Sequence, residues 1–240
     1  MPSDLYVALS GQVTMDERLT TIANNVANMR TAGFRAETVD FKSVFSETRS
    51  ESVAFATVGT QHIDRRQGPI ERTGNQLDVA ISGDGFFAIQ TPEGLAYTRD
   101  GRFTVNEAGD LLTVTGHAVT DEGGAPMVVD PARGPISFGT DGTVSQEGAV
   151  VGRIGLFAIP EAANLSRYGD AAVLSDLPVE PVEDRVLNGV RQGYLEGSNV
   201  NAVHAITELI EVQRAFEYAN SSVSDRNRSL QQAVRTLGAE

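Results

Sequence analysis

The chain has 240 residues, of which 40% are hydrophobic, and it contains no Cys, no Trp and three His. This length is enough to bury the core of one large domain or of two smaller ones. The absence of Cys excludes a thiol nucleophile and a Cys/His zinc site, and the net charge of −13 argues against nucleic-acid binding, which starts from a basic surface.

The negative charge is concentrated in the middle of the chain. Residues 1–35 carry three acids and three Arg, and residues 201–240 carry five acids and four Arg. Residues 36–200 hold the other 24 acids and 12 bases, so the middle carries −12 while the two ends are nearly neutral. No stretch approaches the roughly 20 apolar residues of a membrane span, and the N-terminus shows no conventional signal peptide, so we expect neither.

The first predicted element is an N-terminal helix with an apolar seam. Apolar residues recur every three or four positions, interrupted once by Gln12: Leu5, Ala8, Met15, Leu19, Ile22, Val26 and Met29. This spacing is the heptad pattern of helices that pack against other helices. Ser3 is a suitable N-cap, and Gly33 can take the left-handed conformation that ends a helix.

Three asparagines lie near the end of this helix, at Asn24, Asn25 and Asn28, shortly before Gly33 and Phe34. A single Asn on a helix would most simply face solvent. Three of them within five residues favour amide contacts between neighbouring helices.

The middle of the chain has the pattern of an antiparallel β domain. Residues 35–76 are polar with weak periodicity and are interpreted as a connector. From Leu77 to Ile159, turn dipeptides such as Glu93-Gly94 and Glu147-Gly148 alternate with short β-rich runs, which predicts hairpins over residues 77–177. Residues 178–200, with Pro178 and Pro181, are interpreted as a second connector.

A second long helix is predicted for residues 201–240. No Gly or Pro occurs from Ala202 to Leu237, and Asn201 is a natural N-cap. One heptad position reads Ala202, Leu209, Phe216, Val223, Leu230 and Leu237, and its companion reads Ile206, Gln213, Asn220, Asn227 and Val234. A narrow seam of this kind needs a partner helix. The predicted fold class is therefore α+β, in which the N-terminal helix (1–34) and the C-terminal helix pair in a coiled-coil layer and the β domain is inserted between them.

Three segments resemble the rod and hook family of the bacterial flagellum. "IANNVANMRTAGFRAE" at residues 22–37 is similar to the N-terminal motif of that family, and "GDGFFAIQTPEGLAYTRDGRFTVNEAGDLLTVTGHAV" at 83–119 resembles its central β motif. "GYLEGSNVNAVHAITELIEVQRAFE" at 193–217 resembles its C-terminal motif. Met29-Arg30 departs from the short polar residues usual there, and Ala202 replaces a frequent Pro.

Within the family, the chain length and the "LEGSNV" at 195–200 resemble the proximal rod branch, with the distal rod branch as the alternative. The resemblance implies a structural subunit that polymerises in a helical assembly with itself and with other proximal and distal rod proteins. It further implies export by the flagellar type III apparatus without a cleaved signal, a place in the periplasmic rod of the basal body, and close contact with the surrounding rings.

The predicted assembly interface combines both helices with the residues at their ends. It consists of Leu5, Met15, Leu19, Ile22, Asn24, Asn25, Val26, Asn28, Gly33, Phe34, Asn199, Asn201, Ile206, Leu209, Gln213, Phe216, Asn220, Val223, Leu230 and Val234.

Other functions find little support in the residues. Gly83-Asp84-Gly85 lacks the residues of a phosphate loop and is typical of a hairpin turn, and no Asp begins an EF-hand pattern. His117 and His204 stand apart from any nucleophile, so we expect no enzyme, no cofactor and no metal. A secreted coiled-coil adhesin is the non-flagellar alternative, although it would ordinarily carry a signal peptide.

Overall fold

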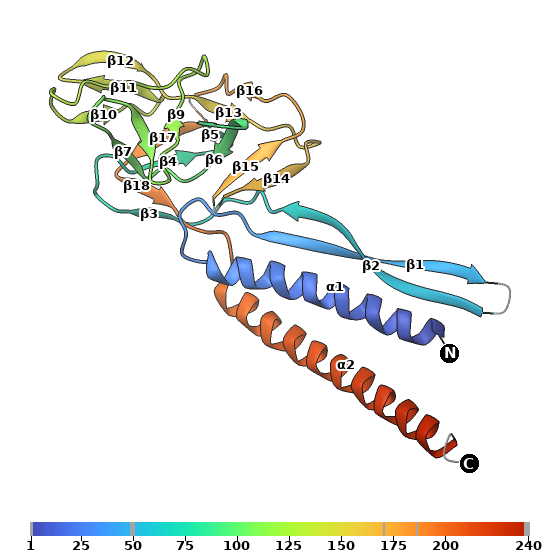
Figure 1. Ribbon diagram of the computed structural model, residues 1–240. Coiled ribbons are helices and arrows are strands. Elements are labelled where there is room, and N and C mark those ends of the chain that lie inside the picture. Colours follow the sequence, from blue (N-terminus) through green and yellow to red (C-terminus); the bar gives the residue numbers. More distant parts are fainter. Residues whose placement is uncertain (1, 49–50, 170, 186, 238–240) are drawn as a thin grey trace. The chain divides into compact units, whose positions relative to one another are not determined.

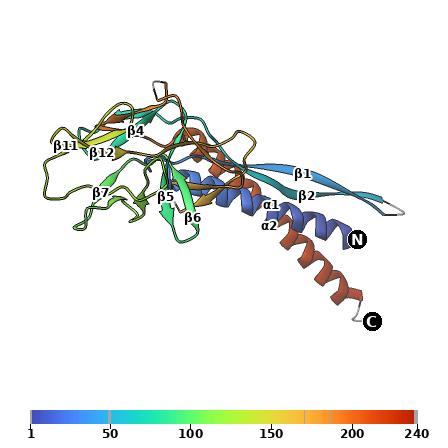
Figure 2. The ribbon, with the colours of Figure 1, turned by 90° about the horizontal axis from the view of Figure 1, so that it is seen from above.

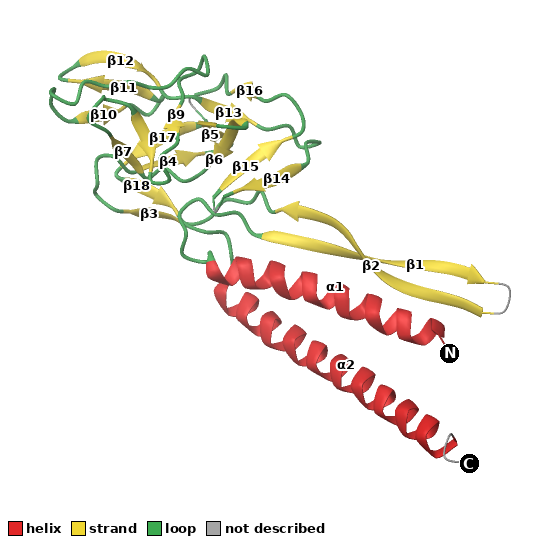
Figure 3. Cartoon of the chain, in the orientation of Figure 1, coloured by secondary structure: helices red, strands yellow, loops and turns green. Residues whose placement is uncertain are grey.

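The computed structural model describes residues 2–48, 51–169, 171–185 and 187–237. Within these ranges it contains two helices and eighteen strands (Figures 1 and 3). The helices are α1 (Pro2–Ala27) and α2 (Ala202–Leu237). The strands are β1 (Glu37–Thr48), β2 (Glu51–Ile63), β3 (Ile70–Arg72), β4 (Val79–Ser82), β5 (Phe86–Thr91), β6 (Gly94–Thr98), β7 (Phe103–Val105), β8 (Leu111–Thr113), β9 (Ala118–Val119), β10 (Ile136–Phe138), β11 (Thr143–Gln146), β12 (Ala149–Arg153), β13 (Leu156–Ala158), β14 (Leu165–Tyr168), β15 (Ala172–Ser175), β16 (Glu180–Pro181), β17 (Gly189–Gln192) and β18 (Tyr194–Glu196).

The chain forms two compact units, and each is assembled from segments that are distant in the sequence. The first unit holds α1, the β1–β2 pair up to His62, and α2. The second unit consists of Asn28–Ala36 and Ile63–Val200 and holds the remaining strands. The domain boundaries expected from the sequence remain a prediction.

In the first unit, α1 contacts both α2 and β1. The two helices run antiparallel beside each other in both views (Figures 1 and 2). Arg18 of α1 and Glu208 of α2 form an ion pair with 2.6 Å between Nη2 and Oε1, on a partly exposed face. The β1–β2 pair occupies residues whose weak periodicity had suggested only a connector.

The predicted fold class is wrong in its coiled-coil layer. The structure is mostly β sheet, and the two helices described do not bury a continuous seam. Among the α2 residues whose side chains are described, Ala205 and Val212 are buried, whereas the seam residue Ile206 is 41% exposed. Gln213 and Asn220, also placed on the seam, are exposed as well. A coiled-coil layer requires buried knobs along both helices, and the side chains that the structure describes on this pair do not form such a series. The part of the prediction that fits is a β-rich region inserted between two helices.

The second unit is built around a nine-stranded sheet. Its main path runs β14-β15-β6-β5-β9-β8-β7, and β13 joins β5 to β16. A separate three-stranded sheet has the order β10-β11-β12. The antiparallel hairpins predicted from the turn dipeptides are confirmed at β5–β6, where Thr91 pairs with Gly94, and at β11–β12, where Gln146 pairs with Ala149.

Strand β5 is buried on both faces because it contributes to two hydrophobic clusters. Phe87 and Ile89 point into the larger cluster, whereas Phe86 and Ala88 belong to the smaller one. Successive side chains of a strand point to opposite faces, so a run of apolar residues is required where both faces are covered. This central strand gives the second unit the rigid frame on which the candidate site is built.

Candidate functional site

The candidate site begins at the turn after α1. The Thr31 hydroxyl donates to Asn28 Oδ1 at 3.0 Å, and Gly33 follows with φ +68°. A Cβ at Gly33 would lie 2.2 Å from the backbone nitrogen of Asp100, so only glycine fits both the conformation and the space. Phe34 is then fully buried, and Arg35 enters the interior of the second unit.

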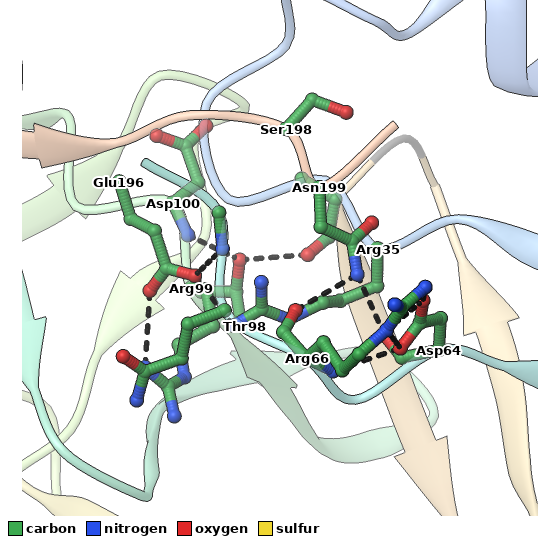
Figure 4. Close-up of polar contacts among 12 residues, drawn as sticks. Arg35, Asp64, Arg66, Thr98, Arg99, Asp100, Glu196, Ser198 and Asn199 are labelled. Carbon is green, nitrogen blue, oxygen red and sulfur yellow. Dashed lines mark hydrogen bonds and ion pairs between the residues drawn. The ribbon is translucent and has the colours of Figure 1, made fainter. Parts of the chain in front are cut away.

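The centre of the site is the carboxylate of Glu196, which lies between two arginines (Figure 4). Its Oε1 is 2.6 Å from Arg35 Nη2, and its Oε2 accepts a hydrogen bond of 3.0 Å from Arg99 Nη1. The Gly68 backbone N–H also donates to Oε1 at 2.9 Å. The three charged side chains are only 1–3% exposed. We refer to Arg35, Arg99 and Glu196 as the buried charge cluster.

Arg99 is the most fully satisfied cation of the cluster. Its Nη2 donates to the Gly83 carbonyl at 3.1 Å, and its guanidinium lies over the Phe86 ring, 4.9 Å from the centroid. Burial lowers the pKa of Arg99 to about 10, although the neighbouring carboxylate of Glu196 opposes that shift. Arg99 therefore keeps its charge at neutral pH.

Arg35 depends more heavily on Glu196. Its Nε and Nη1 are buried and find no hydrogen-bond acceptor among the residues that the structure describes. Two buried guanidinium groups thus share one carboxylate. Since an uncompensated buried charge is costly, loss of Glu196 would penalise both arginines at once.

Asn199 joins the two segments that lead to the helices. Its Oδ1 accepts from the Ala36 N–H at 2.7 Å, and its Nδ2 donates to the carbonyls of Asp64 at 3.1 Å and Arg66 at 2.8 Å. Its backbone N–H donates to the Phe34 carbonyl at 3.2 Å. The segment following α1 and the segment preceding α2 are therefore held together within the second unit.

Two further arginines support this arrangement, and no local sequence pattern indicates either of them. Arg167 donates to the Arg35 carbonyl at 2.6 Å and lies over the Phe34 ring, 4.3 Å from its centroid. Arg65 donates to three carbonyls, those of Ile159, Pro160 and Ala163, at 2.7–3.2 Å. Both contacts span long sequence distances, which periodicity cannot detect.

In the first unit, Asn25 binds the start of β1. It donates to the Glu37 carbonyl at 2.7 Å and accepts from the Glu37 N–H at 2.9 Å. Contacts of the three asparagines with neighbouring helices remain a prediction. The N-cap predicted at Asn201 is confirmed, because its Oδ1 accepts from the His204 N–H at 3.1 Å.

The predicted interface residues fall into three groups by burial. The buried ones are Ile22, Gly33 and Phe34. The half-buried ones are Met15, Leu19, Asn24, Asn25, Val26, Asn28, Asn199, Leu209 and Phe216. The exposed ones are Asn201, Ile206, Gln213 and Asn220, while the side chains of Leu5, Val223, Leu230 and Val234 lie outside the described part. Their role in assembly remains a prediction.

Among the described residues, no three His, Cys, Asp or Glu side chains are grouped as metal ligands would be. His117 lies against the Tyr168 ring, with 5.6 Å between ring centroids. The described helices include none that is long and apolar enough to span a membrane. What the buried charge cluster and Asn199 do is hold distant segments in one arrangement.

The buried charge cluster joins three segments of the second unit that are distant in the sequence, an arrangement that suits a structural protein. Three family models match it in order: "Flagella basal body rod protein" at residues 5–35, "Flagellar hook protein FlgE/F/G D1 domain" at 80–146, and "Flagellar basal body rod FlgEFG protein C-terminal" at 191–236. Each model covers one member of the cluster, namely Arg35, Arg99 and Glu196.

Three curated relatives each match the chain over 93% or more of its length. The chain is 45% identical to the flagellar basal-body rod protein FlgF of Mesorhizobium japonicum, with 100% of both chains covered. It is 33% identical to FlgF of Escherichia coli, over 93% of this chain and 94% of that protein. It is 31% identical to FlgG of Bacillus subtilis, over 98% of both. The chain belongs to the flagellar basal-body rod family, is most like FlgF, and is a structural subunit of the rod.

Proposed function

We propose that this subunit occupies the proximal part of the rod, where it polymerises with its own copies and with other rod proteins. The resulting shaft transmits torque from the motor to the hook and encloses the export channel. The observation that carries this proposal is the buried charge cluster, because it joins one residue from each of the three family segments. We propose a purely mechanical role, without catalysis.

The cluster suits a part that bears load. A carboxylate buried between two guanidinium groups is satisfied in one arrangement of the three segments, so it selects that arrangement even where its net contribution to stability is small. Asn199 adds two hydrogen bonds to the segment after α1, at Phe34 and Ala36, and two more to the carbonyls of Asp64 and Arg66. These contacts would therefore resist displacement of the segment after α1 relative to the segment before α2 when torque acts on the subunit.

The resemblance to rod proteins also suggests how the subunit reaches the rod and what surrounds it there. We infer export through the flagellar type III apparatus without a cleaved signal, followed by assembly in the periplasm beside proximal and distal rod proteins and within the surrounding rings. The nearly neutral ends can pack closely, whereas the charge of −12 on residues 36–200 limits adhesion to neighbouring structures. A contact between two different surfaces repeats along a screw axis, as growth of a tube requires.

A distal rod position is the second candidate, because FlgG of B. subtilis aligns over 98% of both chains. The identity of 45% to FlgF of M. japonicum, over 100% of both chains, favours the first position over the 31% identity to that FlgG.

Electron microscopy of basal bodies tests the proposal. In cells whose only copy lacks residues 202–240, rods should stop short and carry no hook, and the full-length chain should restore both. An internal control is export of the truncated chain, measured in the periplasmic fraction. Complete hooks and filaments in the truncated strain would show that the chain is dispensable to the shaft.

A further inference from the structure

The three-stranded sheet β10-β11-β12 has an open edge at β12. Within the described part of the chain, β12 pairs only with β11 and forms the outer strand of this sheet (Figure 1). Its residues Ala149, Val150 and Val151 are all exposed, and Val150 is 71% exposed. The run 148–152 contains neither a charged residue nor a Pro, which are common means of keeping an edge strand from pairing with another chain.

The backbone of Val150 is directed to this open edge. The β11–β12 hairpin turns at Glu147-Gly148, where φ is 51° and 81°, and Gln146 pairs with Ala149 across the turn. The pair that closes a two-residue turn is hydrogen-bonded, and because such pairs alternate along an antiparallel ladder, the next pair, Ser145 with Val150, is not. The N–H and C=O of Val150 therefore point away from β11, where a further strand can bond to them.

The residues along this edge complement a second copy of the same strand. In two antiparallel β12 strands with Val150 opposite Val150, Ala149 of each copy lies opposite Val151 of the other, and Glu147 lies opposite Arg153. The middle of the pair is then apolar, and each end joins an acid to a base. Among the described residues Glu147 forms no ion pair, while Arg153 is 45% exposed and its Nη1 and Nη2 each lie 3.5 Å from an acid of the same chain. Both charges are thus available to a second copy.

We propose that β12 of one free subunit pairs antiparallel with β12 of a second copy, so that the backbone groups of the two Val150 residues bond to each other. A second copy is the occupant because the same strand supplies both halves of the contact, including the opposite charges at its ends. A bulge at Val151 limits regular pairing to this short stretch, so the contact is weak. The contact is two-fold symmetric and stops at a dimer, whereas a tube grows by contacts that repeat from copy to copy. The dimer therefore goes beyond the proposed function, and a subunit has to leave it before joining a rod.

Sedimentation of the purified full-length chain over a concentration series tests the contact, and we expect a monomer–dimer equilibrium. Glu147→Arg and Arg153→Glu, made singly, place like charges opposite each other at both ends of the pair and should each weaken dimerisation about tenfold. The double variant restores opposite charges in exchanged positions and should recover the wild-type equilibrium. Association through the helices would respond to none of these changes. A wild-type chain that stays monomeric up to about 1 mM, single variants that dimerise like the wild type, or a double variant no better than the single ones would overturn the proposal.

Cross-linking gives a second measurement, because the chain contains no Cys of its own. Residues directly opposite each other in an antiparallel pair have Cβ atoms roughly 4.5–5.5 Å apart, so Val150→Cys treated with a short bismaleimide should give covalent dimers of the free subunit. The matched control is Val128→Cys, since Val128 is 52% exposed on the same unit and lies outside β12. Equal dimer yields from the two variants would refute the contact and leave the rod function standing.

Discussion

Replacing Glu196 by Ala should lower the free energy of unfolding of the second unit by about 3–5 kcal/mol, the usual cost of removing one partner from a buried ion pair. The reason is specific to this site. Arg35 and Arg99 are 2–3% exposed, and the substitution leaves both guanidinium groups without their shared carboxylate. Because the stability of folded domains is typically about 5–15 kcal/mol, this is a large fraction of the total.

Urea unfolding followed by circular dichroism measures the effect. With the slope typical of small proteins, the midpoint should fall by about 1–2 M. Arg66→Ala is the matched control, because the Arg66–Asp64 pair has the same 2.6 Å separation as Arg35–Glu196 but its arginine side chain is 85% exposed. Its cost should be about 1 kcal/mol or less. Equal midpoint shifts for the two variants would refute the reasoning that burial makes the cluster critical.

Three further predictions concern single positions. Gly33→Ala should destabilise the chain more than Gly74→Ala. Both glycines have a positive φ (+68° and +77°), but of the two only Gly33 has backbone atoms within 2.2–2.7 Å of the new Cβ. Equal melting temperatures of the two variants would contradict this. Burial acts to raise the pKa of Asp64, but hydrogen bonds from Arg66 outweigh it and hold the pKa below its usual value. The wild-type chain should therefore be more stable than Asp64→Asn above about pH 4, and this difference should disappear as the pH falls through the lowered pKa of Asp64. A difference in melting temperature that stays constant between about pH 2 and pH 7 would contradict this prediction. Asn201→Ala should cost α2 about 0.5–2 kcal/mol through loss of its cap, seen as reduced helical circular dichroism, while an unchanged spectrum would argue against a capping role.

Sequence patterns predicted the helices and hairpins, because these elements are determined by residues close to one another in the chain. The two helices followed from apolar spacing, and the hairpins followed from dipeptides such as Glu93-Gly94. The β1–β2 pair was missed, because only part of it, such as Val39-Asp40-Phe41-Lys42, alternates apolar with polar residues. The coiled-coil layer was wrong for a different reason: heptad spacing shows that a helix has an apolar face, but it does not show what covers that face. In this chain Ala205 and Val212 are buried instead of Ile206 and Gln213.

The site was predictable only in part. The segments that contain Arg35, Arg99 and Glu196 were identified as family motifs, yet nothing in the sequence indicated that the three charges meet. Arg35 and Glu196 are separated by most of the chain, and such pairing is a property of the folded topology. The glycines near these residues, Gly33 and Gly197, are a signal of close backbone approach but not of which charges pair.

A cryo-electron microscopy reconstruction of the rod in isolated basal bodies, at side-chain resolution, would show directly whether this chain is a rod subunit. We expect rod subunits that fit this sequence, in which Glu196 lies between Arg35 and Arg99 and the segments on either side enter the two helices. A rod without density for this chain, or a subunit whose ends separate at Glu196, would contradict it.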